Sequence, residues 1–208
     1  EILESENRQL RSVAGAVTPD RRQPVTARAV TAPGGAFAHT VLVANGREQG
    51  IERGNPVVTA DGLVGLVVDV GATYARVLMI SDINAQIPVI LSSSSWPGVT
   101  VGNNGTFLSL RFLPEEAAPK VGELVLTSGH GGVLPAGVPV GRVDLVMDDF
   151  VRVRPAVDLR HLSYVSILVG GTEGIDLDNL ALEDYYTPLP ETEGPRLFEG
   201  VNAAGERQ

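Results

Sequence analysis

The residues best suited to chemistry in this sequence are one serine in a glycine-rich loop and three histidines. Ser128 lies in the segment SGHGG, and the histidines are His39, His130 and His161. A serine hydrolase needs a histidine base beside the nucleophile, a carboxylate that orients the base, and an oxyanion hole. The available set is Ser128 with His39 and either Asp61 or Asp69. Ser128 stands in neither a GDSGG nor a GxSxG context, so we predict that it lies in a turn with His130. A two-barrel serine-protease-like enzyme is kept as an alternative.

The sequence predicts no bound metal and no cofactor. It contains no cysteine, no HExxH motif and no closely spaced pair of histidines, which leaves no recognisable zinc site. The loop GHGG is followed by neither the helix nor the lysine that a phosphate-binding loop requires. The acidic pairs at 115–116 and 148–149 are most simply solvated turns. We therefore predict no catalytic residue in this chain.

The acidic charge of the chain is concentrated at its C-terminal end. The formal net charge is −9, from 16 Lys and Arg against 25 Asp and Glu. Residues 172–208 hold nine acidic residues against Arg196 and Arg207, a balance of −7, so residues 1–171 carry only −2. A nearly neutral body offers no basic face for phosphates, and nucleic acid is not an expected partner. No apolar run reaches the roughly 18 residues of a membrane helix. Because Glu1 stands within a helical pattern, we expect a membrane anchor upstream.

Short alternating strands separated by glycine and proline turns account for most of the chain, and they predict an all-β fold of two small barrels. The expected strands are 25–30, 40–44, 57–59, 64–70, 75–80, 86–91, 98–102, 106–113, 123–127, 138–147, 150–154 and 164–169. The segment SSSSWPG at 92–98 is the clearest break, and Trp96 within it is expected to plug the end of a barrel.

Side-chain alternation predicts which residues of two strands point into a core. In the strand at 64–70, one face is expected to carry Val64, Leu66, Val68 and Val70, and the other Gly65, Val67 and Asp69. In the strand at 106–113, the side chains of Leu108, Leu110 and Phe112 are expected to point inward.

A spacing of 68 residues indicates that the two barrels are related. Gly54, Val57 and Thr59 have the same residue types as Gly122, Val125 and Thr127. Asp61-Gly62 favours a type I′ hairpin, because this turn requires positive φ angles. The structural turn residues predicted from these patterns are Gly54, Asp61, Gly62, Gly122, Gly129 and Gly141.

These patterns divide the chain into five parts. They are a coiled-coil helix (1–17), a linker (18–24), a first β-barrel (25–97), a second β-barrel (98–171) and an acidic, proline-containing tail (172–208). A strand that crosses between the barrels is left open. The tail has the composition of a flexible segment, although its apolar and aromatic residues are candidates to dock on a surface: Leu177, Leu180, Tyr185 and Tyr186.

The N-terminal helix is expected to associate with a second helix. Its seam has the 4-3-4-3 spacing of a heptad repeat and consists of Leu3, Asn7, Leu10, Ala14 and Val17. Asn7 would occupy an a-type position, where a buried amide can fix the register. The alternative is a single amphipathic helix that packs on its own barrel.

Four segments together resemble one family, the bacterial rod-shape-determining MreC proteins. They are ENRQLR in the helix, then VLVANGREQGIERGNPVVTADGLVGLVVDVG, ARVLMISDINAQIPV and VGELVLTSGHGGVLPAGVPVGRV. The resemblance covers roughly residues 5–169. It does not extend to the tail.

The resemblance implies a non-enzymatic scaffold of the cell-elongation machinery. Such proteins have an N-terminal anchor in the inner membrane, a coiled coil, and two β-barrels on the periplasmic face. They associate with themselves and contact MreD and a class B penicillin-binding protein, which implies a role in organising and activating peptidoglycan synthesis. Unpaired barrel edges, together with the helix seam, would allow a dimer or a filament to form. A periplasmic adaptor protein is a further alternative, but the α-hairpin and lipoyl-like hairpin of an adaptor are missing from the pattern.

Overall fold

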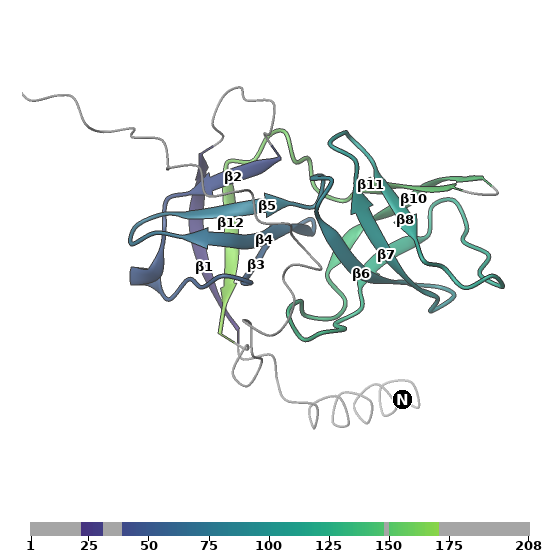
Figure 1. The fold of residues 1–208 in the computed structure, drawn as a ribbon, viewed down its shortest axis with the longest axis horizontal. Helices are drawn as coiled ribbons and strands as arrows, with labels where there is room; N and C mark the ends of the chain where they lie inside the picture. The colour runs from purple at the N-terminus through teal and green to yellow at the C-terminus, as the bar shows by residue number, and fades with distance from the viewer. Residues whose placement is uncertain (1–21, 31–38, 148–149, 171–208) are drawn as a thin grey trace, which may run out of the picture.

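A computed structural model describes residues 22–30, 39–147 and 150–170, and these form two closed, antiparallel, six-stranded β-barrels (Figure 1). The all-β, two-barrel prediction is confirmed. The predicted helix at 1–17, with its seam, lies outside the described residues, as do the 148–149 turn and the tail at 172–208. Among the described residues, no helix has the length and apolar character needed to cross a bilayer.

Each barrel is a ring of six strands. In order around its ring, the first barrel contains β1 (Gln23–Val30), β12 (Tyr164–Val169), β3 (Pro56–Val58), β4 (Leu63–Val70), β5 (Ala75–Met79) and β2 (Thr40–Val43). The second contains β10 (Pro139–Met147), β11 (Phe150–Pro155), β8 (Leu108–Arg111), β7 (Pro97–Gly102), β6 (Gln86–Leu91) and β9 (Leu124–Thr127). A 3-10 turn, η1 (Arg47–Gln49), follows β2. Closed rings pair the edges of their strands, so the expected open edges for strand addition are not present in the described barrels.

The strand pairing differs from the predicted division at residues 97 and 98. Strand β6, placed in the first barrel by the sequence, pairs with β7 and β9 of the second. Strand β12 returns to the first barrel, where it pairs with β1 and β3. The serine-rich break is a hairpin loop, because the Leu91 N–H donates to the Trp96 carbonyl at 3.0 Å. Loop composition alone does not distinguish such a hairpin from a linker between domains.

The two barrels repeat one arrangement of turn and strand. Gly54 donates its N–H to the Val67 carbonyl at 2.8 Å, and Gly122 donates to Val143 at 2.8 Å. The next residues, Asn55 and Glu123, are 0% and 7% exposed. Each has a side-chain oxygen that accepts the backbone N–H three residues earlier, at 2.8 Å and 3.1 Å. The related φ angles are 87° at Gly54 and 89° at Gly122.

The predicted alternation in β4 is wrong, because this strand serves both cores. Its pairing with β3 skips Val64 between Leu63 and Gly65, and this bulge reverses the side-chain alternation between Val64 and Val67. Val64 and Val67 pack in the core of the first barrel, whereas Leu66 packs with the residues of the second.

The barrels meet through packed side chains and backbone. Leu63 and Leu66 of β4, and Ile80 directly after β5, belong to the hydrophobic core of the second barrel. Leu159 lies in the connector between β11 and β12 (residues 156–163) and packs against the cores of both barrels. The Ala156 N–H donates to the Val140 carbonyl at 2.9 Å. This continuity makes the junction part of the folded core.

Two of the predicted turn glycines have a different role from the one expected. Gly62 has φ of 153° and Asp61 has no positive φ, so the β3–β4 connection is not the type I′ turn. A Cβ at Gly62 would lie 2.2 Å from the Pro139 carbonyl oxygen, across the junction. Gly141 lies within β10, where a Cβ would be 2.2 Å from the carbonyl oxygen of Arg154. Close approach of backbone selects glycine at both positions.

Candidate partner-binding surfaces

The structure does not assemble the hydrolase set. His39 Nδ1 lies 3.0 Å from Ser81 Oγ, in the first barrel. Ser128 accepts the N–H of His130 at 3.2 Å, and the turn predicted for this pair contains the φ of 75° at Gly129. Asp69 forms an ion pair with Arg76 at 3.6 Å. The Asp61 N–H donates to Thr59 Oγ1 at 3.3 Å.

A catalytic role for His161 and a metal site are also poorly supported. His161 lies on the exposed connector, with Nδ1 2.9 Å from Asp158 Oδ2. Over the described ranges, no group of three or more His, Asp or Glu side chains is placed to hold a metal ion. The described barrels therefore offer surfaces for binding, and two of these surfaces have distinctive chemistry.

The first surface, which we call the distal rim, is a set of exposed apolar side chains near the hairpin of β10 and β11. These two strands extend to the end of the second barrel away from the first (Figure 1). The members of the distal rim are Phe112, Val121, Val146, Met147 and Phe150. Strand register brings them to one end: Met147 pairs with Phe150, and the pairing of Val151 with Leu110 places Phe150 beside the end of β8. Val121 precedes the Gly122 N–H that bonds to β10.

Phe112 is the most exposed member of the distal rim, although the alternation of its strand predicts that it points inward. Leu108 and Leu110 are buried as predicted, but Phe112 is 75% exposed and has φ of 58°. A bulky side chain rarely adopts this left-handed conformation, which ends the alternation of β8. The core end beneath the rim is instead covered by Leu113 and the half-buried Trp96, which pack on the core of the second barrel as predicted for a plug.

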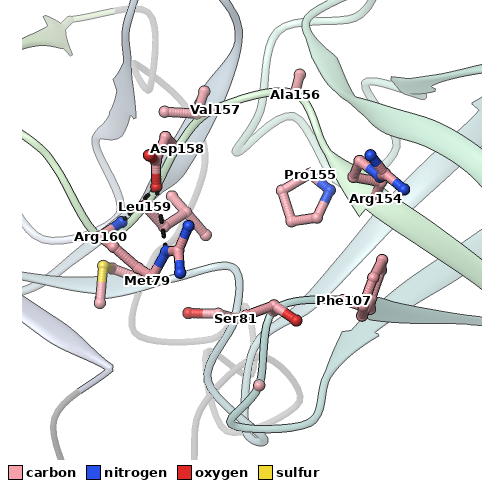
Figure 2. Close-up of a pocket in the computed structure, with 12 residues that line it drawn as sticks. Met79, Ser81, Phe107, Arg154, Pro155, Ala156, Val157, Asp158, Leu159 and Arg160 are labelled. Carbon is pink, nitrogen blue, oxygen red and sulfur yellow. Dashed lines mark hydrogen bonds and ion pairs between the residues drawn. The ribbon is translucent and has the colours of Figure 1, made fainter.

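The second surface, which we call the junction pocket, is a cavity of about 590 Å³ between the barrels. Met79 and Ser81 come from the first barrel, Phe107 from the loop before β8, and the connector after β11 supplies the remaining wall (Figure 2). Met79, Ser81 and Val157 are buried, whereas Phe107 and Leu159 are half-buried. Arg154 and Arg160 lie on opposite sides of the opening (Figure 2). The pocket combines an apolar interior with two cationic side chains at its mouth.

A network of charges fixes one wall of the junction pocket. Asp144 accepts hydrogen bonds from Arg152 Nε at 2.8 Å and Arg154 Nη2 at 2.7 Å. The Arg152 guanidinium carbon lies 4.3 Å from the centre of the Phe107 ring, a cation–π contact. The hydrogen bond from Arg152 lowers the pKa of Asp144; partial desolvation opposes this effect, and the hydrogen bond from Arg154 adds to it.

The opposite wall carries a second, more exposed ion pair. Arg160 Nε lies 3.5 Å from Asp158 Oδ1, and the hydrogen bond from His161 together with the Arg160 N–H lowers the pKa of Asp158. The side chains of Arg154 and Arg160 are 67% and 74% exposed, so most of each guanidinium faces solvent.

Sequence reasoning misses both surfaces. The distal rim depends on the conformation at Phe112, which reverses an otherwise regular alternation. The junction pocket joins residues separated by up to 81 positions, Met79 and Arg160, and it exists only because β12 returns to the first barrel. The spacing of Arg152 and Arg154 indicates an outward-facing alternation, but nothing in it indicates a pocket.

Two rigid barrels with exposed apolar and cationic surfaces define a class of tandem-barrel interaction protein. The family model described as "Rod shape-determining protein MreC, barrel core" matches residues 30–169. The chain belongs to the MreC family. This is a cell-shape-determining structural family, and the chain is not an enzyme.

Relatives and solved structures agree with this assignment. The cell shape-determining protein MreC of Caulobacter vibrioides is 34% identical over 194 residues, which cover 93% of this chain and 56% of the relative. The Escherichia coli protein of the same name is 30% identical, with 93% and 58% covered. The chain thus spans a little over half the length of these curated relatives.

The fold is shared with solved MreC structures. The crystal structure of MreC from Pseudomonas aeruginosa has a TM-score of 0.66 at 30% identity, covering 70% of this chain and 98% of that one. A structure of the complex between Penicillin-Binding Protein (PBP2) and MreC from Helicobacter pylori contains a chain with a TM-score of 0.54. At 17% identity, with 72% of this chain and 100% of that one covered, the likeness shows the fold alone.

Proposed function

We propose that this chain is the periplasmic part of a scaffold that organises the bacterial cell-elongation machinery and helps to activate peptidoglycan synthesis. The observation that carries the proposal is the distal rim, an exposed apolar surface held on a rigid barrel. Soluble proteins rarely expose such residues together unless they bind a partner. Family membership supplies the cell-shape context, and the MreC chain of the Helicobacter pylori complex supports a penicillin-binding protein as the partner.

We infer that the distal rim contacts a class B penicillin-binding protein. Aromatic residues and methionine are enriched at the centres of protein interfaces, and Phe112, Met147 and Phe150 supply such side chains from one end of the barrel. Because a closed barrel holds these residues in place, little conformational entropy is lost when a partner binds. An apolar segment of the transpeptidase ectodomain is the matching surface.

A binding measurement tests this assignment. Phe112→Ser and Met147→Ser should each weaken the affinity for a class B penicillin-binding protein ectodomain by roughly tenfold or more, the usual effect of losing an interface anchor. Isothermal titration calorimetry provides the affinity. Ile83→Ser is the matched control, because Ile83 is 57% exposed in the loop between β5 and β6, where the chain passes from one barrel to the other. If the control weakens binding and the rim variants do not, the contact lies near that loop and not on the distal rim.

We also propose that the chain associates with itself through the seam of Leu3, Asn7, Leu10, Ala14 and Val17, as a dimer or a filament. Because both barrels are closed, self-association by adding a strand at a barrel edge is not expected. The helix seam and the outer faces of the barrels remain as the surfaces for it. Leu10→Glu should place a charge in the seam and lower the association state measured by analytical ultracentrifugation. Unchanged association would favour the helix that packs on its own barrel.

Two further partners are proposed from the family resemblance. One is MreD, and the other is the inner membrane, reached through an anchor upstream of Glu1. Co-purification of the membrane-anchored protein with MreD, compared between the native chain and the Phe112→Ser variant, separates these contacts from the distal rim.

A further inference from the structure

The junction pocket has a chemistry that the distal rim lacks, because it pairs an apolar interior with cations at its opening. Met79 and Val157 are buried in its floor, and Phe107 and Leu159 are partly accessible at its sides. Its volume of about 590 Å³ is within the ~300–1,000 Å³ that ligand sites usually occupy. A suitable occupant places an aromatic or aliphatic side chain inside and carboxylates outside.

The cations at the opening have unused hydrogen-bonding capacity. A guanidinium carries five N–H donors, and Arg154 directs Nη2 to Asp144 while Arg160 directs Nε to Asp158. Since both side chains are mostly exposed, a carboxylate approaching from solvent can be bound in a bidentate manner without breaking these pairs. The occupant should therefore be acidic.

The tail of this chain contains a segment with the required composition. Residues 183–186 read Glu-Asp-Tyr-Tyr, two carboxylates followed by two aromatic rings, within a tail whose net charge is −7. The described charges around the pocket have the opposite excess, with Arg152, Arg154 and Arg160 against Asp144 and Asp158. Charge and aromatic content thus complement the pocket.

The chain is also long enough to reach. From Arg160 at the pocket to Val169 at the end of β12 is nine residues, at most about 30 Å at the extended rise per residue. From Val169 to Glu183 is a further 14 residues, which span up to roughly 46 Å. The segment can therefore return to the pocket of its own molecule.

We propose that the junction pocket binds residues 183–186 of the same chain, with a tyrosine ring inside and the two carboxylates on Arg154 and Arg160. The docked tail would lie across the junction and hold the two barrels in one relative position. The distal rim lies at the other end of the second barrel, so the proposal is independent of the partner assigned to the rim.

The two methionines provide a direct test in the full chain, because Met79 lines the pocket and Met147 lies on the distal rim. In ¹³C-methyl NMR spectra, Tyr185→Ser/Tyr186→Ser should shift the Met79 signal toward that of an open pocket and leave the Met147 signal unchanged. High salt should produce a shift in the same direction, because exposed ion pairs are screened. An unchanged Met79 signal in both conditions overturns the proposal.

Charge reversal identifies the occupant. Arg160→Glu should reduce the docked fraction about threefold to tenfold, and combining it with Glu183→Lys/Asp184→Lys should restore it. Arg53→Glu, on an exposed loop of the first barrel, is the matched control and should have no effect. If the Met79 shift disappears on dilution, the occupant is the tail of a second copy, and docking within one chain is wrong.

Discussion

An Ile167→Ala substitution is expected to lower the free energy of unfolding of the first barrel by about 2–5 kcal/mol, the usual cost of truncating a buried isoleucine. Ile167 is 0% exposed and packs in the first core, although it follows the whole second barrel in the sequence. Its strand fills the ring between β1 and β3, where Ile167 pairs with Val25 and Val57. The cavity therefore weakens the closure of the ring as well as its core.

Hydrogen exchange read by mass spectrometry distinguishes the two barrels in this experiment. Amides of β1 and β3 should exchange faster in the variant, because their partner strand opens more often. Fluorescence of Trp96, the single tryptophan, reports the second barrel. Ile83→Ala makes the same substitution at a 57% exposed residue and should change neither signal. Faster exchange confined to the second barrel would contradict the assignment of β12.

Local patterns are enough to predict the strands but not the way in which they close. The predicted ranges 86–91 and 164–169 match β6 and β12 as observed, because each strand is an apolar run between turns. Which barrel each joins depends on long-range pairing, such as Ser166 with Val58 and Val89 with Thr127. Both strands are compatible with either ring by composition, so sequence proximity assigns them to the wrong ones.

Side-chain orientation is mispredicted where the backbone departs from a regular strand. The bulge at Val64 in β4 puts Val67 on the inward face, and the left-handed conformation at Phe112 turns an aromatic residue outward. Alternation assumes an unbroken period of two, and one irregular residue reverses it. The distal rim arises from such a reversal, which explains why the surface most relevant to binding is the hardest to predict.

The second large effect is expected at Glu123, where Glu123→Gln should lower the free energy of unfolding by about 1–3 kcal/mol at neutral pH. The carboxylate accepts the N–H groups of Ser93 and Ser94 through Oε1, and that of Lys120 through Oε2. In glutamine one of the two oxygens is replaced by an NH₂ group. That group is a donor, and it would face a backbone N–H, which is also a donor. The substitution therefore leaves at least one part-buried backbone N–H of the second barrel without its acceptor.

The same carboxylate predicts a dependence of stability on pH. Burial alone would raise the pKa of Glu123, but the hydrogen bonds from Lys120, Ser93 and Ser94 outweigh burial and lower the pKa below its ordinary value of 4.5. A lowered folded-state pKa stabilises the protein above the unfolded value, and this stability is lost as the pH falls through the folded one. The stability gap between the native chain and Glu123→Gln should thus narrow below about pH 4.5.

Urea unfolding followed by Trp96 fluorescence measures this gap, because Trp96 ends the hairpin loop that Glu123 holds. Glu116→Gln, on an exposed loop, is the matched control and should leave the midpoint of urea unfolding unchanged.

The related turn of the first barrel provides an internal comparison for the effect of pH. Asn55 occupies the corresponding position in the first barrel and bonds the Glu52 N–H in the same way, but its amide does not titrate. Acid should therefore loosen this turn in the second barrel and spare its counterpart in the first, whereas a gap independent of pH would show that Glu123 acts by shape alone.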